Sequence, residues 1–368
     1  MSVEFLPDSD ARAAGAPLRS VPPGSRRVMV GLGLAGLVAV GAIVVGTGHG
    51  GSVAKPTPAP SLQAQPLPPP PVVPVHFTRP ESVAFGAPSV DVLAAGGRMY
   101  SLTPTLIGMA GRYGTDPVVR AAPFGLSERD DRARLFLDPQ HSLLWAVAVG
   151  GTAIGAYDSE TLDPLSETAA PYTINGAVAM DESLWFTTDH GLYRAQAGPG
   201  RPKRVAHMRI ALGAIVADRT LHRIITADRR QPVRLHAMTA YGRLASQRVP
   251  LATVTSMAFP SGALWLSGTT PAGPRLIVLD PPSMRIRRVI PVPGQLGHAA
   301  SFVASYGTRL LMRAAPDDTA LYCVDGYTGT FKQVWRLSLG TVSLDAHGLL
   351  VDAGRGIAAR GAGACLAP

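Results

Sequence analysis

The chain has 368 residues, which is enough for one large domain or two ordinary ones, and 46% of them are hydrophobic, so a sizeable core is expected. Glycine (40) and proline (34) are in excess, which favours many turns over long helices. The net charge is +9, and 31 of the 34 basic residues are arginine; this bias has two interpretations, base composition of the gene or attraction to an anionic surface. The two cysteines, Cys323 and Cys365, lack metal-ligand spacing.

The N-terminal part contains a candidate membrane anchor. Residues 1–27 are polar and small without apolar periodicity, so we expect a disordered cytoplasmic tail. Residues 28–47 follow, 20 residues without a charge, which at about 1.5 Å per residue span the roughly 30 Å hydrocarbon layer as one helix. The tail carries four arginines, whereas the other flank offers only Lys55 nearby. Because basic residues stay on the cytoplasmic side, the rest of the chain is expected outside a single-pass anchor.

The alternative is a cleaved export signal and a secreted product. Ser25, Arg26 and Arg27 before the apolar run resemble a twin-arginine signal, and residues 52–54 are small enough for a cleavage site. The apolar run exceeds the roughly 7–15 residues usual for a signal-peptide core. We therefore favour a retained anchor.

Residues 48–75 are expected to form a linker, since residues 55–75 alone contain nine prolines. Proline fixes φ and removes a backbone donor, which favours a hydrated polyproline II spacer over a packed element. At about 3.1 Å per residue, residues 55–75 reach some 60 Å. The linker thus separates the anchor from a domain at residues 76–368.

A repeat in that domain predicts its fold. Leu-Trp pairs begin at Leu144, Leu184 and Leu264, at intervals of 40 and 80 residues. A period near 40 with short strands is typical of β-propellers. Comparable strands begin near Met99, Leu144, Leu184, His222, Leu264, Leu310 and Leu349, each usually preceded by a strand of small residues suited to a central channel. We predict an all-β, seven-bladed propeller, with six blades as the alternative.

The two ends of the domain are expected to pair. The last predicted blade lacks one strand, and residues 76–80 or residues 82–85 precede the first inner strand without a blade of their own. Pairing the two would close the ring and remove exposed sheet edges. Cys323 and Cys365 fall in neighbouring blades, so we also expect a disulfide that stabilises the last blade by roughly 2–4 kcal/mol.

Aspartates recur in the turns, at Asp158, Asp280 and Asp325. Asp in such turns accepts hydrogen bonds from backbone N–H groups two residues on, which explains the recurrence without a catalytic role.

Four segments carry a resemblance to known families: residues 263–266 (ALWL), 279–282 (LDPP), 156–161 (AYDSET) and 324–329 (VDGYTG). Over residues 85–368 the chain resembles exported bacterial propellers of the streptogramin-lyase, YVTN-repeat and quinoprotein-repeat kind. The resemblance implies the fold only, since such propellers include lyases, quinone-dependent dehydrogenases and binding modules. Trp335 alone stands where a quinone-docking consensus would recur, and no cofactor is assigned. Nucleophile elbow, His-Glu-x-x-His, phosphate loop and Cys-x-x-Cys motifs are absent from the sequence.

A ligand site is expected at the channel mouth, where loops entering the innermost strands meet turns between second and third strands. The first set of loops supplies Asp130, Asp131, Asn175, Arg209 and His298. The second supplies Asp189, His190, Asp228, Arg229, Arg230, Asp317, Asp318 and Arg355. The candidate ligand-binding residues are Asn175, His190, Arg209, Asp228, His298 and Asp318.

We expect a membrane-anchored binding or scaffold module for a protein, peptide or glycan of the cell envelope. The alternative is an exported metal-dependent lyase or hydrolase, in which His190 and His298 with Asp228 or Asp318 hold a divalent cation; streptogramin-type lyases are similar in using histidines and a metal on this face. The sequence leaves open whether the protein is an enzyme. Nucleic acid is not expected as a partner on the exported side.

Overall fold

The computed structural model describes residues 81–83, 89–111, 116–122, 133–205, 208–239, 242–293, 296, 300–306, 308–313, 320–326, 328–336, 342–344, 349–352 and 357–361. The chain divides into two compact units, Met1–Leu67 and Pro68–Pro368, and all described residues belong to the second. The predicted tail, membrane segment and linker lie outside the described residues. Across the described residues, we find no helix with the length and apolar character needed to cross a bilayer.

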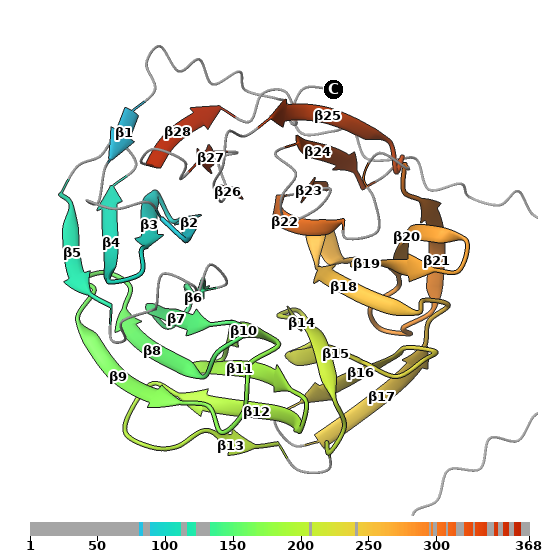
Figure 1. Ribbon diagram of the computed structural model, residues 1–368, viewed down its shortest axis with the longest axis horizontal. Coiled ribbons are helices and arrows are strands. Elements are labelled where there is room, and N and C mark those ends of the chain that lie inside the picture. Colours follow the sequence, from blue (N-terminus) through green and yellow to red (C-terminus); the bar gives the residue numbers. More distant parts are fainter. Residues whose placement is uncertain are drawn as a thin grey trace, which may run out of the picture. The chain divides into compact units, whose positions relative to one another are not determined.

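The described strands form seven four-stranded antiparallel sheets (Figure 1). The first strands, which lie innermost, are β2 (Asp91–Ala95), β6 (Ala133–Asp138), β10 (Gly176–Met180), β14 (Leu212–Asp218), β18 (Thr253–Ala258), β22 (Ser301–Tyr306) and β26 (Val342–Leu344). The second strands are β3 (Arg98–Leu102), β7 (Leu143–Ala148), β11 (Ser183–Thr188), β15 (Arg223–Asp228), β19 (Leu264–Thr270), β23 (Arg309–Arg313) and β27 (Leu349–Asp352).

The third strands are β4 (Leu106–Gly111), β8 (Ala153–Asp158), β12 (Gly191–Gln196), β16 (Arg234–Thr239), β20 (Gly273–Leu279), β24 (Ala320–Asp325) and β28 (Ile357–Gly361). The outermost strands are β5 (Val118–Ala121), β9 (Pro164–Ala169), β13 (Lys203–Arg204), β17 (Gly242–Arg248), β21 (Ile286–Pro291), β25 (Phe331–Arg336) and β1 (Glu81–Val83). One 3₁₀ turn, η1 (Pro260–Gly262), connects β18 to β19.

The innermost strands make contact in a closed cycle. Each contacts the innermost strand of the next sheet along the chain, and β26 returns to contact β2. The sheets of this unit therefore surround a common axis, as Figure 1 shows. This is the arrangement of a β-propeller.

The last sheet joins the two ends of the described chain. β1 pairs antiparallel with β28, with Glu81 opposite Ala359 and Val83 opposite Ile357. The other two strands of that sheet are β27 and β26, both from the C-terminal end. This is the closure that the sequence predicts, and it gives β28 a neighbour on its outer edge.

The Leu-Trp pairs pack the sheets against one another. Successive residues of a strand point to opposite faces. In β11, Leu184 accordingly packs in a cluster with β7, whereas Trp185 packs with Leu212 and Ile224 of the following sheet. Trp145 and Trp265 pack in the same way, and all three indoles are at most 2% exposed. The repeat in the sequence is therefore a repeat of sheet-to-sheet contacts.

Side chains also link neighbouring innermost strands, which do not pair through their backbones. Asp91 Oδ2 accepts a hydrogen bond from the backbone N–H of Leu135 at 2.7 Å. Ser256 Oγ accepts one from the backbone N–H of Phe302 at 2.9 Å. Short polar side chains thus satisfy backbone groups that would otherwise be buried without a partner.

The turn aspartates act as predicted. Asp158 Oδ1 accepts the backbone N–H groups of Glu160 and Thr161, both at 2.8 Å. Asp280 and Asp325 accept corresponding bonds three residues on. In each of these turns the fourth residue after the Asp has positive φ: 59° at Leu162, 56° at Met284 and 71° at Gly329. The recurrence of Asp is therefore explained by one repeated turn geometry.

Candidate functional site

The predicted ligand face is built around the turn between β11 and β12. Thr188 Oγ1 accepts the backbone N–H of His190 at 3.0 Å and its hydroxyl donates to the Gly191 carbonyl at 3.1 Å. Gly191 has φ +132°, and a Cβ there would lie 2.0 Å from the Met208 carbonyl oxygen. Only glycine fits both the conformation and the space. The turn therefore holds Asp189 and His190 at the surface.

Three polar side chains converge beside this turn. The Nδ2 of Asn175, from the loop entering β10, donates to Asp189 Oδ1 at 2.9 Å and to the Leu212 carbonyl at 2.8 Å. Arg229, from the turn after β15 in the next sheet, donates through Nη1 to Asp189 Oδ1 at 2.8 Å. The Asp189 and Arg229 side chains are 59% and 54% exposed. We call the end of the propeller that carries these three residues the Asn175 face.

His190 lies in an aromatic stack on the Asn175 face. Its ring and that of Tyr172 have centroids 3.9 Å apart with a tilt of 32°. Tyr172 is 6.1 Å from Tyr193, which stacks on the buried Phe186 at 5.6 Å. Both His190 and Tyr172 are exposed. The stack therefore runs from the core to the surface and ends on an aromatic pair open to solvent.

The structure brings only some of the predicted residues together. Asn175 and His190 both lie at the β11–β12 turn, because Asn175 bonds to Asp189, the residue before His190. Arg209 is exposed in the loop that enters β14. Asp228 is buried instead, because Oδ1 accepts the backbone N–H of Arg234 at 2.8 Å. Its Oδ2 lies 3.5 Å from His236 Nε2, also buried. The expectation that Asp228 lies in an exposed loop was therefore wrong.

The remaining predicted residues fall outside the described part of the chain. These are His298, Asp318 and, among the further loop residues, Asp130, Asp131, Asp317 and Arg355. The predicted disulfide is not tested either: Cys323 is buried in β24, but Cys365 lies outside the described residues. Both predictions stand as predictions.

Tyr172 is a residue of this site that the loop-by-loop prediction did not include. That prediction selected charged, amide and histidine side chains, and Tyr172 lies in the same β9–β10 loop as Asn175. Its position three residues before Asn175 was a usable signal, because an exposed aromatic in a loop is a frequent binding residue.

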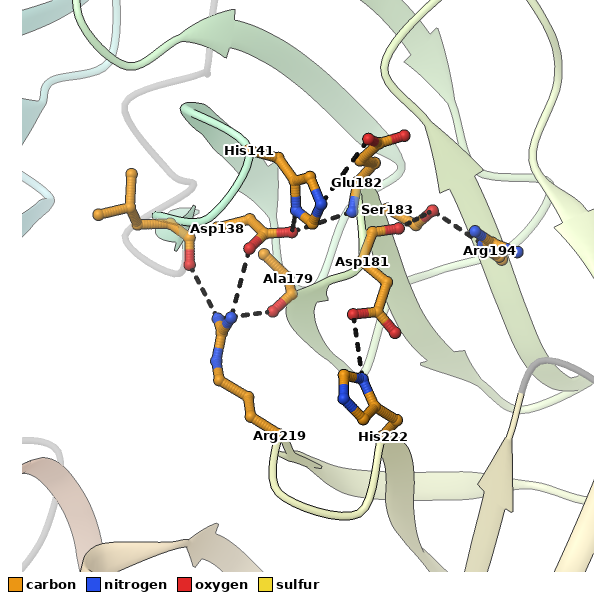
Figure 2. A network of polar contacts seen from close by, with 10 residues as sticks. Asp138, His141, Ala179, Asp181, Glu182, Ser183, Arg194, Arg219 and His222 are labelled. Atoms are coloured by element: carbon orange, nitrogen blue, oxygen red, sulfur yellow. Dashed lines mark hydrogen bonds and ion pairs between the residues drawn. The ribbon is translucent and has the colours of Figure 1, made fainter.

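The opposite end of the propeller carries a second polar cluster, shown in Figure 2. Asp138, at the end of β6, is fully buried, and its Oδ2 lies 3.0 Å from His141 Nδ1 and accepts the Glu182 backbone N–H at 3.0 Å. Arg219 donates to Asp138 Oδ1 at 3.3 Å and to the carbonyls of Leu137 and Ala179 at 3.2 and 3.0 Å. Turns of three successive sheets thus meet at one carboxylate. We call this end the Asp138 face.

The charge of Asp138 is stabilised where it lies. Burial alone would raise the pKa of this carboxyl, but the hydrogen bonds from Glu182, His141 and Arg219 outweigh burial and hold the pKa below its ordinary value. The turn at Asp181 and Glu182 has φ of 51° and 58°, the geometry of a type I′ hairpin turn. Asp181 lies 3.7 Å from His222, so both residues of this turn contact neighbouring sheets.

Neither face shows a metal centre within the parts of the chain that the structure describes. No group of three or more His, Cys, Asp or Glu side chains there has the geometry to hold a metal ion. The proposed metal ligands His298 and Asp318 lie outside the described residues. Chemically, the described Asn175 face offers hydrogen-bond donors and acceptors, arginine charge and an aromatic surface.

Comparison with known proteins supports the fold. No known family model matches the sequence, and no curated protein matches it. The structure is similar to the β-propeller domain of Cps50 (Swd1) from Myceliophteria thermophila, with a TM-score of 0.58 and 12% identity over 77% of this chain and 99% of that one. It is also similar to the WD40 propeller of Doa1, with a TM-score of 0.53 and 12% identity over 77% and 97% of the two chains.

A third similar structure is PorZ, described as an essential bacterial surface component of the type-IX secretion system of Porphyromonas gingivalis. Its TM-score is 0.51 at 12% identity, over 74% of this chain and 36% of PorZ. At these identities the likeness extends to the fold alone. The chain is a β-propeller, and its resemblance to exported lyases remains a prediction.

Proposed function

We propose that this protein is a binding or scaffold module of the cell envelope that presents its Asn175 face to a ligand. The observation that carries the proposal is the convergence of Asn175, Asp189 and Arg229 from two sheets into one exposed, hydrogen-bonded group. Because these side chains are already held by one another, a ligand does not have to order them on binding. Preorganised polar groups beside an aromatic surface are typical of recognition sites.

The proposed location rests on the sequence. An uncharged run at residues 28–47 follows an arginine-containing tail, and a proline-rich spacer separates it from the propeller. This order suits a propeller held on the outer side of a membrane by an uncleaved anchor.

The experiment tests the membrane anchor and the binding face independently of each other. The full chain, produced with its N-terminal segment, is expected in the membrane fraction after washing at high salt and to keep its first residues. When solubilised envelope is passed over the immobilised chain, we expect one component to stay bound to it. The Arg229→Ala, Asp189→Ala double variant is expected not to retain that component. The double variant Arg120→Ala, Asp163→Ala is the matched control, since it removes another exposed ion pair, between β5 and the turn before β9.

Retention by the control and loss by the Asn175-face variant support the proposal. If both double variants retain the component equally, the result contradicts a ligand site at the Asn175 face. The same conclusion follows if both variants fail to retain it. A soluble product that begins after residue 54 contradicts the anchor and leaves the binding face to be judged separately.

A further inference from the structure

The aromatic pair on the Asn175 face is a rigid surface. Tyr172 is 42% exposed, and its ring is fixed between His190 at 3.9 Å and Tyr193 at 6.1 Å. Tyr193 is only 5% exposed and stacks on Phe186, which is in the core. Because Tyr193 is packed against the core, Tyr172 is held from below and loses little conformational freedom when a ligand contacts it.

Exposed arginines lie near the turn that carries His190. Arg204 lies directly opposite Tyr193 in the pairing of β12 with β13, so the two side chains share one face of the sheet. Its Cδ lies 3.9 Å from the position that a Cβ on Gly191 would take, next to His190. Arg209 is exposed and follows Met208 in the sequence. The carbonyl of Met208 lies against Gly191.

The charge around the pair is unbalanced. Arg229 completes the set of arginines and pairs with the carboxylate of Asp189, whereas among the described residues no ion pair is seen for Arg204 or Arg209. Arg204 and Arg209 are both exposed; Arg204 contacts the Gly191 position, and Arg209 is the neighbour of Met208, whose carbonyl oxygen lies at that position too. This distribution favours an anionic ligand over a neutral or cationic one.

We propose that the Tyr172–His190 pair and the flanking Arg204 and Arg209 bind an acidic glycan, that is, a saccharide chain bearing carboxylates. This proposal rests on the proposed function and names the ligand class for the same face. The sugar ring lies against the aromatic pair through its apolar face, and the arginines pair with its carboxylates. Asn175 and Asp189 supply hydrogen bonds to hydroxyl groups.

A glycan fits this surface better than an extended acidic peptide does. Peptides that bind in extended form add to a free strand edge. Tyr172 and His190 instead lie in a loop and a turn at the end of the sheet, where a ligand can contact their rings without pairing with a strand. A saccharide needs a flat apolar surface with polar groups around it, which is what these residues present.

The test is a calorimetric titration of the full chain, in detergent, with a hexamer of galacturonic acid, a neutral galactose hexamer and a hexaglutamate peptide. We expect the acidic hexamer to bind at least about tenfold more tightly than either control, and more weakly as salt is raised. Tyr172→Ala is expected to weaken it by about tenfold or more, whereas Tyr172→Phe keeps the ring and stays within roughly threefold. Arg204→Gln and Arg209→Gln are each expected to weaken it by roughly three- to tenfold.

Leu165→Ala and Arg120→Gln are the matched controls, one exposed apolar residue and one exposed arginine on outer strands away from the Asn175 face. Thermal unfolding of every variant establishes that it is folded. Equal binding of the neutral hexamer, tighter binding of hexaglutamate, or no effect of Tyr172→Ala would overturn the proposal. If no saccharide binds but the immobilised chain still retains an envelope component through Arg229 and Asp189, the glycan inference fails and the proposed function stands.

Discussion

The hydroxyl oxygen of Ser343 accepts a hydrogen bond from the backbone N–H of Ala94 at 3.0 Å, across 249 positions of the sequence. Ser343 belongs to β26 in the last sheet and Ala94 to β2 in the first. Both residues are buried. Together with the pairing of β1 and β28, this bond closes the ring between the two ends of the propeller.

Ser343→Ala is therefore expected to destabilise the closed ring. The substitution leaves the Ala94 N–H buried without its partner, which costs roughly 1–3 kcal/mol in the free energy of unfolding. The measurement is the midpoint of urea unfolding. Thr173→Ala, which removes a hydroxyl at an exposed loop position, is the control and is expected to change that free energy by less than about 0.5 kcal/mol. An unchanged midpoint for Ser343→Ala would show that the bond does not contribute to closure.

The raised pKa of Asp91 predicts how the stability of the propeller depends on pH. Burial raises the pKa of this carboxyl to about 6, although Arg134 and the hydrogen bonds from Leu135 and Val92 oppose the shift. A raised pKa means that the folded state binds the proton more tightly than the unfolded state does. The propeller therefore loses stability as pH rises from about 4 to about 6, by roughly 2–3 kcal/mol at about 1.4 kcal/mol per pKa unit, and loses no more from this group above that window.

Asp91→Asn is expected to remove that pH dependence, since the amide oxygen still accepts the Leu135 N–H and carries no charge. Urea unfolding at pH values from about 4 to about 7 measures the effect, with the exposed Asp163→Asn as control. A wild-type chain whose Asp91-dependent stability rises over this window would contradict the assignment.

Arg219 is expected to stabilise the Asp138 face through the buried carboxylate. Arg219→Met removes its bonds to Asp138, Leu137 and Ala179, at a cost of roughly 1–3 kcal/mol, reduced by the 40% exposure of the arginine. The lowered pKa of Asp138 contributes stability above the unfolded value of about 3.9 that is lost as pH falls through the folded value. The variant is therefore also expected to unfold at a higher pH during acid titration.

The exposed pair of Arg120 and Asp163, 3.3 Å apart, provides the matched comparison for Arg219. Arg120→Met is expected to change stability by less than about 0.5 kcal/mol, since exposed ion pairs contribute little. If the two arginine variants unfold at the same urea concentration, the buried carboxylate does not depend on Arg219.

Gly191→Ala is expected to disturb the turn that carries His190. A methyl group there meets the Met208 carbonyl at 2.0 Å in a conformation, φ +132°, that alanine rarely adopts. We expect a loss of more than about 2 kcal/mol in unfolding free energy. Gly198→Ala, with φ +155° but no atom within 4 Å, isolates the steric contribution. Equal losses in the two variants would mean that the Met208 contact is unimportant.

The disulfide prediction can be tested by counting thiols. We expect the protein, unfolded without reductant, to contain no alkylatable thiol and Cys365→Ser to contain one, at Cys323, with a loss of roughly 2–4 kcal/mol in stability. Two alkylatable thiols in the unfolded, unreduced protein would rule the bridge out.

The sheets were predictable because their signal is local. In each Leu-Trp pair the two side chains point to opposite faces of a strand that is buried on both faces. The turn aspartates mark where third strands end. A strand was expected to begin near His222, and β15 begins one residue later, after a turn in which His222 has φ 46°. Strand ends are defined only to within one or two residues, so this agreement is as close as the signal allows.

The candidate site was harder to predict than the fold. Asn175 and His190 were found because loops that enter first strands and turns that follow second strands meet at one end of the ring. Asp228 was misplaced because one hydrogen bond, from the Arg234 backbone, turns its side chain into the sheet. Such a bond depends on pairing across strands, which the order of residues does not specify.

The most direct test of the binding face is hydrogen–deuterium exchange of the full chain, alone and with solubilised envelope. We expect slower exchange in peptides that cover residues 171–175, 188–191 and 229–232, and no change in those that cover residues 139–142, 181–182 and 219–222. Protection confined to the second group, or no protection anywhere, would contradict a ligand site on the Asn175 face.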